Sequence, residues 1–135
     1  MGAMVPVGSG WSFAITSYDS NANEEIAEHS KNNDPPNDER QYVMVGMRAS
    51  YTGEGESSPL LFGPRLKAIG TSGVEFEADR CGALPPNTLK TGLKLAPGDS
   101  IEGNVCLLVD PADLNSLVFF SEDLVDDVTQ YFVVR

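Results

Sequence analysis

Short segments in which apolar and polar side chains alternate restrict the fold of this chain more than any other feature. The clearest one spans residues 41–51, where every second side chain is apolar or aromatic: Val43, Val45, Met47, Ala49 and Tyr51. An alternation of period two places these side chains on one face of a β-strand. The same pattern predicts half-buried strands over residues 11–16, 74–78 and 101–109.

The segments between these strands are rich in turn-forming residues. Pro97 and Gly98 stand where a type II turn needs a fixed first φ and a positive second φ, which predicts a turn at residues 96–99. Residues 71–73 predict the tight turn of a hairpin. Further strands are expected over residues 60–69, 116–120 and 129–134, and an exposed loop over residues 31–38.

Helical signals are confined to one short region. Asn23 can cap a helix that begins with Glu24 and Glu25, because acidic side chains are favourable in a first helical turn. Seven or eight short strands with one short helical insertion predict an all-β fold, an antiparallel β-sandwich, with a β-barrel as the competing architecture. The 135 residues fit within one domain.

Acidic residues outnumber basic residues by 20 to 9, which gives a formal net charge of −11. Such a surface repels nucleic-acid phosphates and anionic lipid head groups, so we expect neither nucleic-acid binding nor direct membrane binding. A cationic or polar partner is compatible with it; the alternative is that the charge only keeps the protein soluble. No apolar run reaches the roughly 18 residues that span a bilayer as a helix.

The two cysteines, Cys81 and Cys106, could form a disulfide, stay free thiols or contribute to a metal site. A zinc site needs four ligands, and the single histidine, His29, lies in an unrelated acidic segment. Cys106 falls on the opposite face of its strand from Val105 and Leu107, whereas a free structural cysteine is usually buried with the apolar residues. This parity favours the disulfide, and free thiols remain the alternative.

A disulfide at these positions has two consequences. It would fasten the polar loop that contains Cys81 to the outer face of strand 101–109, unlike the antibody disulfide, which joins two sheets through the core. Closing this loop would add on the order of 3 kcal/mol of stability. The bond also requires an oxidising compartment, so the sequence predicts an exported, extracytoplasmic protein.

A resemblance to a known family rests on short segments in a fixed order: residues 11–16, 39–45, 51–55, 79–81, 97–98 and 103–106. This order resembles an immunoglobulin-like domain of unknown function found in secreted Gram-positive lipoproteins of the actinobacterial type. A secreted mycobacterial immunogenic protein with an immunoglobulin-like fold is a more distant relative. The most specific parts are the strand entry at residues 41–43 and the Gly-Asn-Val-Cys strand at residues 103–106 with its upstream Asp79-x-Cys81.

The resemblance implies an immunoglobulin-like domain behind a lipid-anchored N-terminal cysteine and a flexible polar tether. Residues 1–4 are interpreted as a cloning remnant, residues 5–10 as the end of the tether and residues 11–135 as the sandwich domain. The resemblance further implies that the cysteines bridge and that a lipid anchor holds the protein on the outer face of the cell membrane. It implies no catalytic activity.

Few residues suggest catalysis. His29 is the only imidazole for a Ser-His-Asp arrangement, and its charged segment is more typical of a solvated helix surface. Gly53 and Gly55 lack the lysine of a phosphate-binding loop and lie beside two glutamates. We therefore expect no enzyme and no cofactor. A carboxylate-based hydrolase is the less favoured alternative, because twenty acidic side chains always offer some pair at a suitable distance.

Calcium is a better alternative. Asp19, Asn21 and Asn23 match the first three ligand positions of an EF-hand loop, but Glu24 and Ser30 replace its required glycine and final glutamate. Weaker candidates are Asp110 with Asp113, and the acidic turn at residues 122–127 with Asp123, Asp126 and Asp127. Acidic turns of this kind are commonly just solvated.

Residues 117–120 are apolar on both faces of their expected strand. This pattern indicates either an exposed recognition strip or, as we favour, a second face covered by a loop. The leading hypothesis is a non-catalytic binding or interaction module at the cell surface, with an unknown protein or small polar ligand. The alternative is a calcium-stabilised structural domain of the cell envelope. The sequence specifies neither the ligand nor the oligomeric state.

Overall fold

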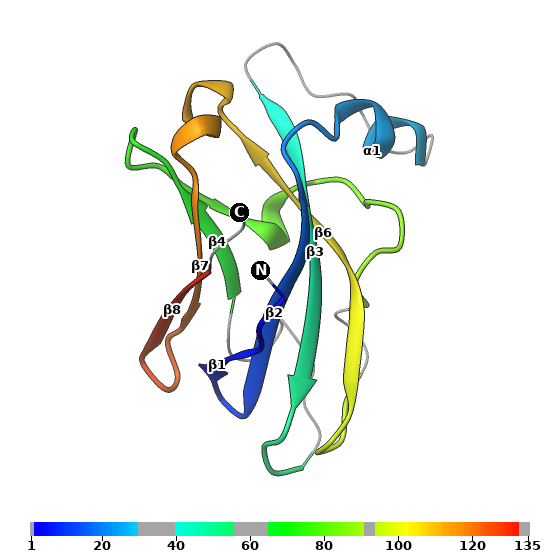
Figure 1. The fold of residues 1–135 in the computed structure, drawn as a ribbon, viewed down its shortest axis with the longest axis vertical. Coiled ribbons are helices and arrows are strands. Elements are labelled where there is room, and N and C mark those ends of the chain that lie inside the picture. The colour runs from blue at the N-terminus through cyan, green and yellow to red at the C-terminus, as the bar shows by residue number, and fades with distance from the viewer. Residues whose placement is uncertain (1, 30–39, 56–64, 91–93, 133–135) are drawn as a thin grey trace.

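The computed structural model describes residues 2–29, 40–55, 65–90 and 94–132, and in these ranges the strands form two packed antiparallel sheets (Figure 1). The first sheet contains, in spatial order, β1 (Val5–Gly8), β2 (Trp11–Asp19), β3 (Gln41–Tyr51) and β6 (Ser100–Val109). The second contains β5 (Glu75–Glu77), β4 (Arg65–Ile69), β7 (Val118–Asp123) and β8 (Val128–Phe132). The predicted β-sandwich is confirmed.

The core lies between the two sheets and follows the predicted alternation. Strand β3 has the predicted bounds, and its inward face buries Val43, Val45, Met47, Ala49 and Tyr51. Trp11 and Phe13 of β2 join this core, as does Phe119 of β7 from the opposite sheet. Large aromatic side chains bury the most apolar area per residue, so these rings contribute strongly to holding the two layers together.

A second, smaller apolar cluster covers the outer face of the first sheet. The helix α1 (Asn23–His29) places Ile26 over Tyr42 of β3, beside the disulfide between Cys81 and Cys106. The Asn23 side chain accepts a hydrogen bond from the Tyr42 backbone N–H (2.8 Å), which ties the start of the helix to the strand. The disulfide therefore lies outside the sandwich core, on the face of β6 that the parity of Cys106 indicated.

The disulfide loop also covers one edge of the first sheet. After the 3₁₀-helix η1 (Ala78–Arg80), the chain runs along β6, where Thr88 forms an isolated bridge with Asn104. The Leu89 N–H donates to the Asn104 carbonyl (2.9 Å), and the Asn104 N–H donates to the Asn87 carbonyl (2.8 Å). An open sheet edge is a template for aggregation, so this loop protects β6.

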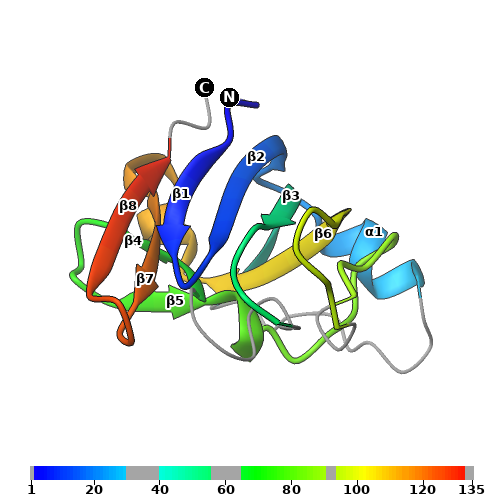
Figure 2. The same cartoon turned by 90° about the horizontal axis from the view of Figure 1, so that it is seen from below.

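The structure has a strand in the region of the expected tether, residues 5–10. Residues 5–8 form β1, which pairs with β2 and also lies beside β8 (Figure 2). The reason is burial: Val7 is fully buried in the core, and Val5 packs against the same cluster. Alternation over so few residues, interrupted by Pro6, gives only a weak strand signal.

The remaining elements refine the predicted bounds. The turn at residues 96–99 is confirmed, with the Asp99 N–H donating to the Ala96 carbonyl (3.0 Å). The strand expected at residues 116–120 starts later and runs further, because residues 111–116 form the 3₁₀-helix η2 (Pro111–Ser116). The expected loop at residues 31–38 and the first part of the expected strand at residues 60–69 lie outside the described residues. No helix in the described part of the chain is long and apolar enough to cross a membrane.

Candidate binding surface at one end of the sandwich

Four turns meet at one end of the sandwich, at the bottom of Figure 1, and we call this surface the turn end. It consists of residues 8–10, 52–55, 96–99 and 124–127. Backbone hydrogen bonds link the first three turns in a row: the Thr52 N–H donates to the Gly10 carbonyl (2.8 Å), and the Gly98 N–H donates to the Tyr51 carbonyl (2.7 Å). The turn end is therefore one connected surface rather than four independent loops.

The β7–β8 turn displays two adjacent apolar side chains on this surface. Leu124 and Val125 are each 80% exposed, the highest exposure among the large apolar side chains of the described residues. Single exposed apolar residues are common on soluble proteins and need no explanation. Leu124 and Val125, however, are neighbours in one hairpin turn.

A buried aspartate holds this turn in place. Asp123, the last residue of β7, is fully buried, and its Oδ1 accepts hydrogen bonds from the backbone N–H groups of Val125 (2.9 Å) and Asp126 (3.4 Å). Its Oδ2 accepts from the Ser9 hydroxyl (2.5 Å) in the β1–β2 turn. A buried carboxylate is tolerated only when its oxygens are hydrogen-bonded, so this side chain fixes the turn and joins it to β1.

The β1–β2 turn is shaped to receive Asp123. Gly8 has φ +99°, and a Cβ atom at this position would lie 2.6 Å from Asp123 Oδ2. Only glycine combines this backbone conformation with this close approach. The next residue, Ser9, also donates its backbone N–H to Asp126 Oδ2 (2.6 Å). Four hydrogen bonds from two turns therefore converge at the base of Leu124 and Val125.

The turn end is acidic. Its four turns contain Glu54, Asp99, Asp126 and Asp127, and no lysine or arginine. Asp99 and Asp126 accept backbone hydrogen bonds, from Ala96 and Ser9 respectively, so part of this charge also shapes the turns. Two of these acids, Asp126 and Asp127, directly follow the apolar tip in the sequence.

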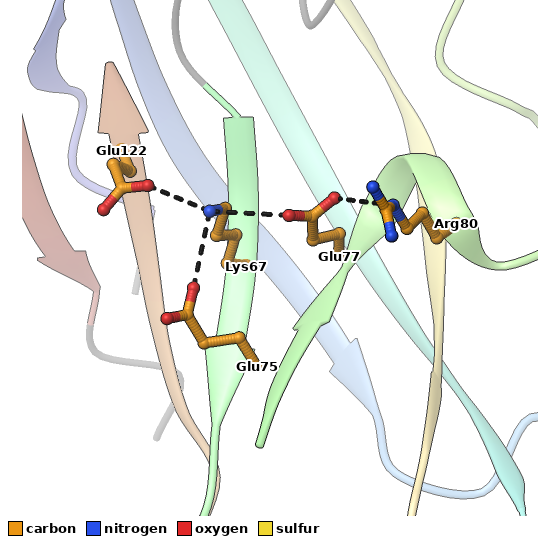
Figure 3. A network of polar contacts seen from close by, with 5 residues as sticks. All are labelled: Lys67, Glu75, Glu77, Arg80 and Glu122. Atoms are coloured by element: carbon orange, nitrogen blue, oxygen red, sulfur yellow. Dashed lines mark hydrogen bonds and ion pairs between the residues drawn. The ribbon is translucent and has the colours of Figure 1, made fainter. Parts of the chain in front are cut away.

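A second group of charges lies on the outer face of the second sheet (Figure 3). Lys67 of β4 is 12% exposed, and its Nζ lies 2.9 Å from Glu122, 3.4 Å from Glu75 and 3.5 Å from Glu77. Arg80 in turn contacts Glu77 at 3.1 Å. The hydrogen bond to Glu122 is the main cause that raises the pKa of Lys67 above its usual 10.5, against the opposing effect of burial.

This charged group joins β4, β5 and β7 across one face, which indicates a structural role.

The neighbouring apolar residues of that face differ in their exposure. Phe120 is buried beside Tyr131, with ring centroids 5.7 Å apart, whereas Val118 and Tyr131 are exposed. Leu117 and Phe119 belong to the core. On this outer face Val118 is exposed and Phe120 is buried, so the face is neither uniformly exposed nor uniformly covered.

The candidate calcium ligands have other hydrogen-bonding roles. Asp19 accepts from the Asn21 backbone N–H (2.9 Å), and Asn23 accepts from Tyr42. Asp110 caps η2 through the Ala112 N–H, and buried Asp113 accepts from the Ser72 hydroxyl (2.6 Å). Within the described ranges, no three His, Cys, Asp or Glu side chains converge as a metal site would require. These hydrogen bonds give Asp19, Asn23, Asp110 and Asp113 each at least one structural partner.

The central pair of the turn end is not among the residues predicted from the sequence. Residues 122–127 are predicted to be a solvated acidic turn, although Leu124 and Val125 stand in the middle of it. Two large apolar residues between two pairs of acids are the signal that could have identified them. The role of Asp123 had no comparable signal, because its partner Ser9 lies 114 residues away in the sequence.

No model of a known protein family matches this sequence, and no curated protein is significantly similar to it. Solved structures with the same fold do exist. A conserved hypothetical protein from Bacillus anthracis superposes with a TM-score of 0.64 at 8% identity, over 98% of this chain and 94% of its own. An uncharacterized β-sandwich protein from Clostridium difficile gives a TM-score of 0.59 at 9% identity, over 100% and 91%.

A third similar structure belongs to a longer protein. It is a Bacillus subtilis protein described as a "putative lipoprotein", with a TM-score of 0.59 and 14% identity. The match covers 94% of this chain but only 37% of the Bacillus subtilis chain. At these identities the similarity establishes the β-sandwich fold and nothing about activity.

Proposed function

We propose that this protein is an exported, non-catalytic binding module with an immunoglobulin-like fold, held at the outer face of the cell membrane by a lipid anchor, and that it binds a protein partner at the turn end. The observation that carries this proposal is the display of Leu124 and Val125 on a turn fixed by Asp123. Binding residues are commonly found on loops that a rigid scaffold positions.

The order of the strands supports an immunoglobulin-like interpretation. If β2 to β8 are taken as strands A to G, then A, B and E lie in one sheet and C, F and G in the other, as in immunoglobulin domains. Strand D, here β5, pairs with C instead of E, and β1 is an additional strand beside A. The arrangement is thus the immunoglobulin order with one strand transferred between sheets.

This assignment also gives the turn end a functional parallel. The β7–β8 turn becomes the F–G loop, and residues 52–55 begin the B–C loop, directly after β3. In immunoglobulin variable domains these two loops lie at the same end and contact antigen. The parallel concerns position on a shared architecture, so it supports a binding role without naming a ligand.

Export is supported by the disulfide between Cys81 and Cys106, because such bonds persist mainly in oxidising compartments. The name of the Bacillus subtilis relative agrees with a lipid-anchored location. A non-catalytic role is supported by the surroundings of His29, which is exposed on α1, distant from the turn end (Figure 1). We retain calcium binding and carboxylate-based hydrolysis only as alternatives, because the candidate acids have structural partners.

Cell fractionation tests the export. We expect the native protein in the membrane fraction, sensitive to protease added outside intact protoplasts. Its mass should be about two units below that of the reduced protein, since a disulfide lacks two hydrogens. A protease-resistant, cytosolic protein with two free thiols would contradict this part of the proposal.

Site-specific cross-linking tests the binding. A benzophenone side chain at position 124 should form a defined adduct with an envelope protein of the source organism, whereas the same group at exposed position 74, at the opposite end, should not. The adduct should diminish when excess unlabelled protein competes. Equal yields at both positions, or none at either, would contradict binding at the turn end.

A further inference from the structure

We propose that the β7–β8 turn is itself the recognition element, and that it inserts Leu124 and Val125 into an apolar pocket whose rim carries lysine or arginine on a folded protein partner. This inference rests on the proposed function and deepens it, because it assigns the residues that bind and the chemistry of the surface that they fit.

The apolar part of the inference follows from exposure and position. Leu124 and Val125 are adjacent at a hairpin tip and are exposed to the same extent, while Val74 and Leu84 are exposed singly in separate turns. A protruding pair of aliphatic side chains is complementary to a concave apolar site. The flat, solvated rim of an interface would leave these two side chains in contact with water.

The rigidity of the turn favours binding to a folded surface. Asp123 accepts hydrogen bonds from Val125, Asp126 and Ser9, so the backbone below the tip is already fixed before a partner arrives. A binding element that is fixed in advance loses less conformational entropy on association than a flexible loop does. Such a turn is suited to insertion into a pocket of fixed shape.

The negative charge of the turn end favours a partner whose pocket has a positively charged rim. Its four turns contain four acids and no basic residue, and the whole chain has a formal net charge of −11. A rim of lysine or arginine would accelerate association and oppose wrong partners. The same charge opposes two other occupants, a second copy of this chain and an anionic membrane, through like-charge repulsion.

An unbiased library of folded single-domain scaffolds with randomised concave surfaces tests this inference. Binders are selected on the intact protein and then measured against L124S/V125S and against V74S as the matched control. Most binders should lose at least about tenfold in affinity with L124S/V125S and keep their affinity for V74S. Their randomised surfaces should be enriched in lysine and arginine over the starting library. Both variants should keep the melting temperature of the parent protein, since all three side chains are exposed.

A pair of charge variants tests the rim separately. Glu54→Gln with Asp127→Asn should slow association of the turn-directed binders several-fold at low salt, whereas Glu25→Gln with Glu28→Gln on α1 should not. Binders that ignore the turn, or turn-directed binders without basic residues, would overturn the inference. So would sedimentation of the protein with phosphatidylcholine vesicles that L124S/V125S abolishes, which would assign the tip to membranes. A partner that cross-links to position 124, but whose contacting surface lacks an apolar pocket with lysine or arginine at its rim, would overturn this inference and leave the proposed binding at the turn end.

Discussion

The two ends of the sandwich use the same structural device and display different surfaces. At the turn end, buried Asp123 accepts from the Ser9 hydroxyl and lies so close to Gly8 that a Cβ there would be 2.6 Å from its Oδ2. At the opposite end, buried Asp113 accepts a hydrogen bond from the Ser72 hydroxyl (2.6 Å). A Cβ atom added to Gly70 would lie 2.5 Å from the Cβ of Asp113. Each aspartate fastens a turn of one strand pair to a neighbouring element.

The difference lies in what each fastened turn exposes. The turn that follows Asp123 carries Leu124 and Val125 at its tip, while the turn next to Asp113 exposes one large apolar residue, Val74. The two buried acids therefore fix turns at both ends of the sandwich, and the ends differ in the side chains that these turns present.

Removing each aspartate should have the largest effect and should separate the two ends. Asp123→Ala leaves the Ser9 hydroxyl and two backbone N–H groups without an acceptor, and Asp113→Ala leaves the hydroxyl and the backbone N–H of Ser72 without one. We therefore expect each substitution to lower the free energy of unfolding by about 2–3 kcal/mol. Urea denaturation measures this loss. Only Asp123→Ala should also weaken turn-directed binding. Equal effects of both substitutions on binding would remove the functional distinction between the ends.

Ser121 lies on the same strand as Asp123, but removing its polar group should have the opposite effect on stability. Its hydroxyl is buried between the sheets and forms no hydrogen bond with any of the described residues, unlike Asp123 two residues later. Ser121→Ala should therefore raise the free energy of unfolding by about 1 kcal/mol, because it removes an unsatisfied buried polar group. The same urea titration measures this gain. A loss of stability would mean that the hydroxyl has a partner, such as an internal water.

Lys67 should make a smaller, pH-dependent contribution to the free energy of unfolding. This contribution belongs to neither end, because the contacts of Lys67 join β4, β5 and β7 in the middle of the sheet. Its pKa is raised above 10.5 in the folded protein, mainly by the hydrogen bond to Glu122. The folded state therefore binds the proton more tightly than the unfolded state. The resulting stability is fully present below pH 10.5 and decreases as the pH rises through the folded pKa.

The experiment compares urea midpoints of the parent protein and Lys67→Met at pH 8 and above pH 11. The difference between them should be about 1 kcal/mol at the lower pH and should shrink at the higher pH. A difference that grows with pH would contradict the direction of the pKa shift.

The exposed tip should contribute least to stability. L124S/V125S should change the free energy of unfolding by no more than about 0.5 kcal/mol, because both side chains are already in water in the folded state. Val74→Ser at the other end should behave alike. A large loss with L124S/V125S alone would show that the tip packs against the protein, and the candidate binding surface would then be absent.

Sequence periodicity predicted what depends on neighbouring residues. The alternation over residues 41–51 gave β3 with its bounds and buried face, and Pro97 with Gly98 gave the turn at residues 96–99. The parity of Cys106 placed its disulfide outside the core, where the second apolar cluster lies. Each of these features is determined within one strand or one turn.

Features that depend on distant partners could not be predicted in this way. Asp123 was expected in a solvated turn, but Ser9 and Gly8 form a site that buries its carboxylate. The strand β1 escaped detection because its burial depends on the core that β2 and the second sheet provide around Val7. The candidate binding surface combines four turns from different parts of the chain, so only the folded structure reveals it.

The proposed recognition requires that Asp123 holds the turn displaying Leu124 and Val125 rigid before any partner binds. Backbone ¹⁵N relaxation of the free protein measures this rigidity. We predict order parameters of about 0.8 or higher at Leu124, Val125 and Asp126, similar to those of the strands, and a clear decrease in Asp123→Ala. Order parameters below about 0.6 for this turn in the intact protein would contradict the account.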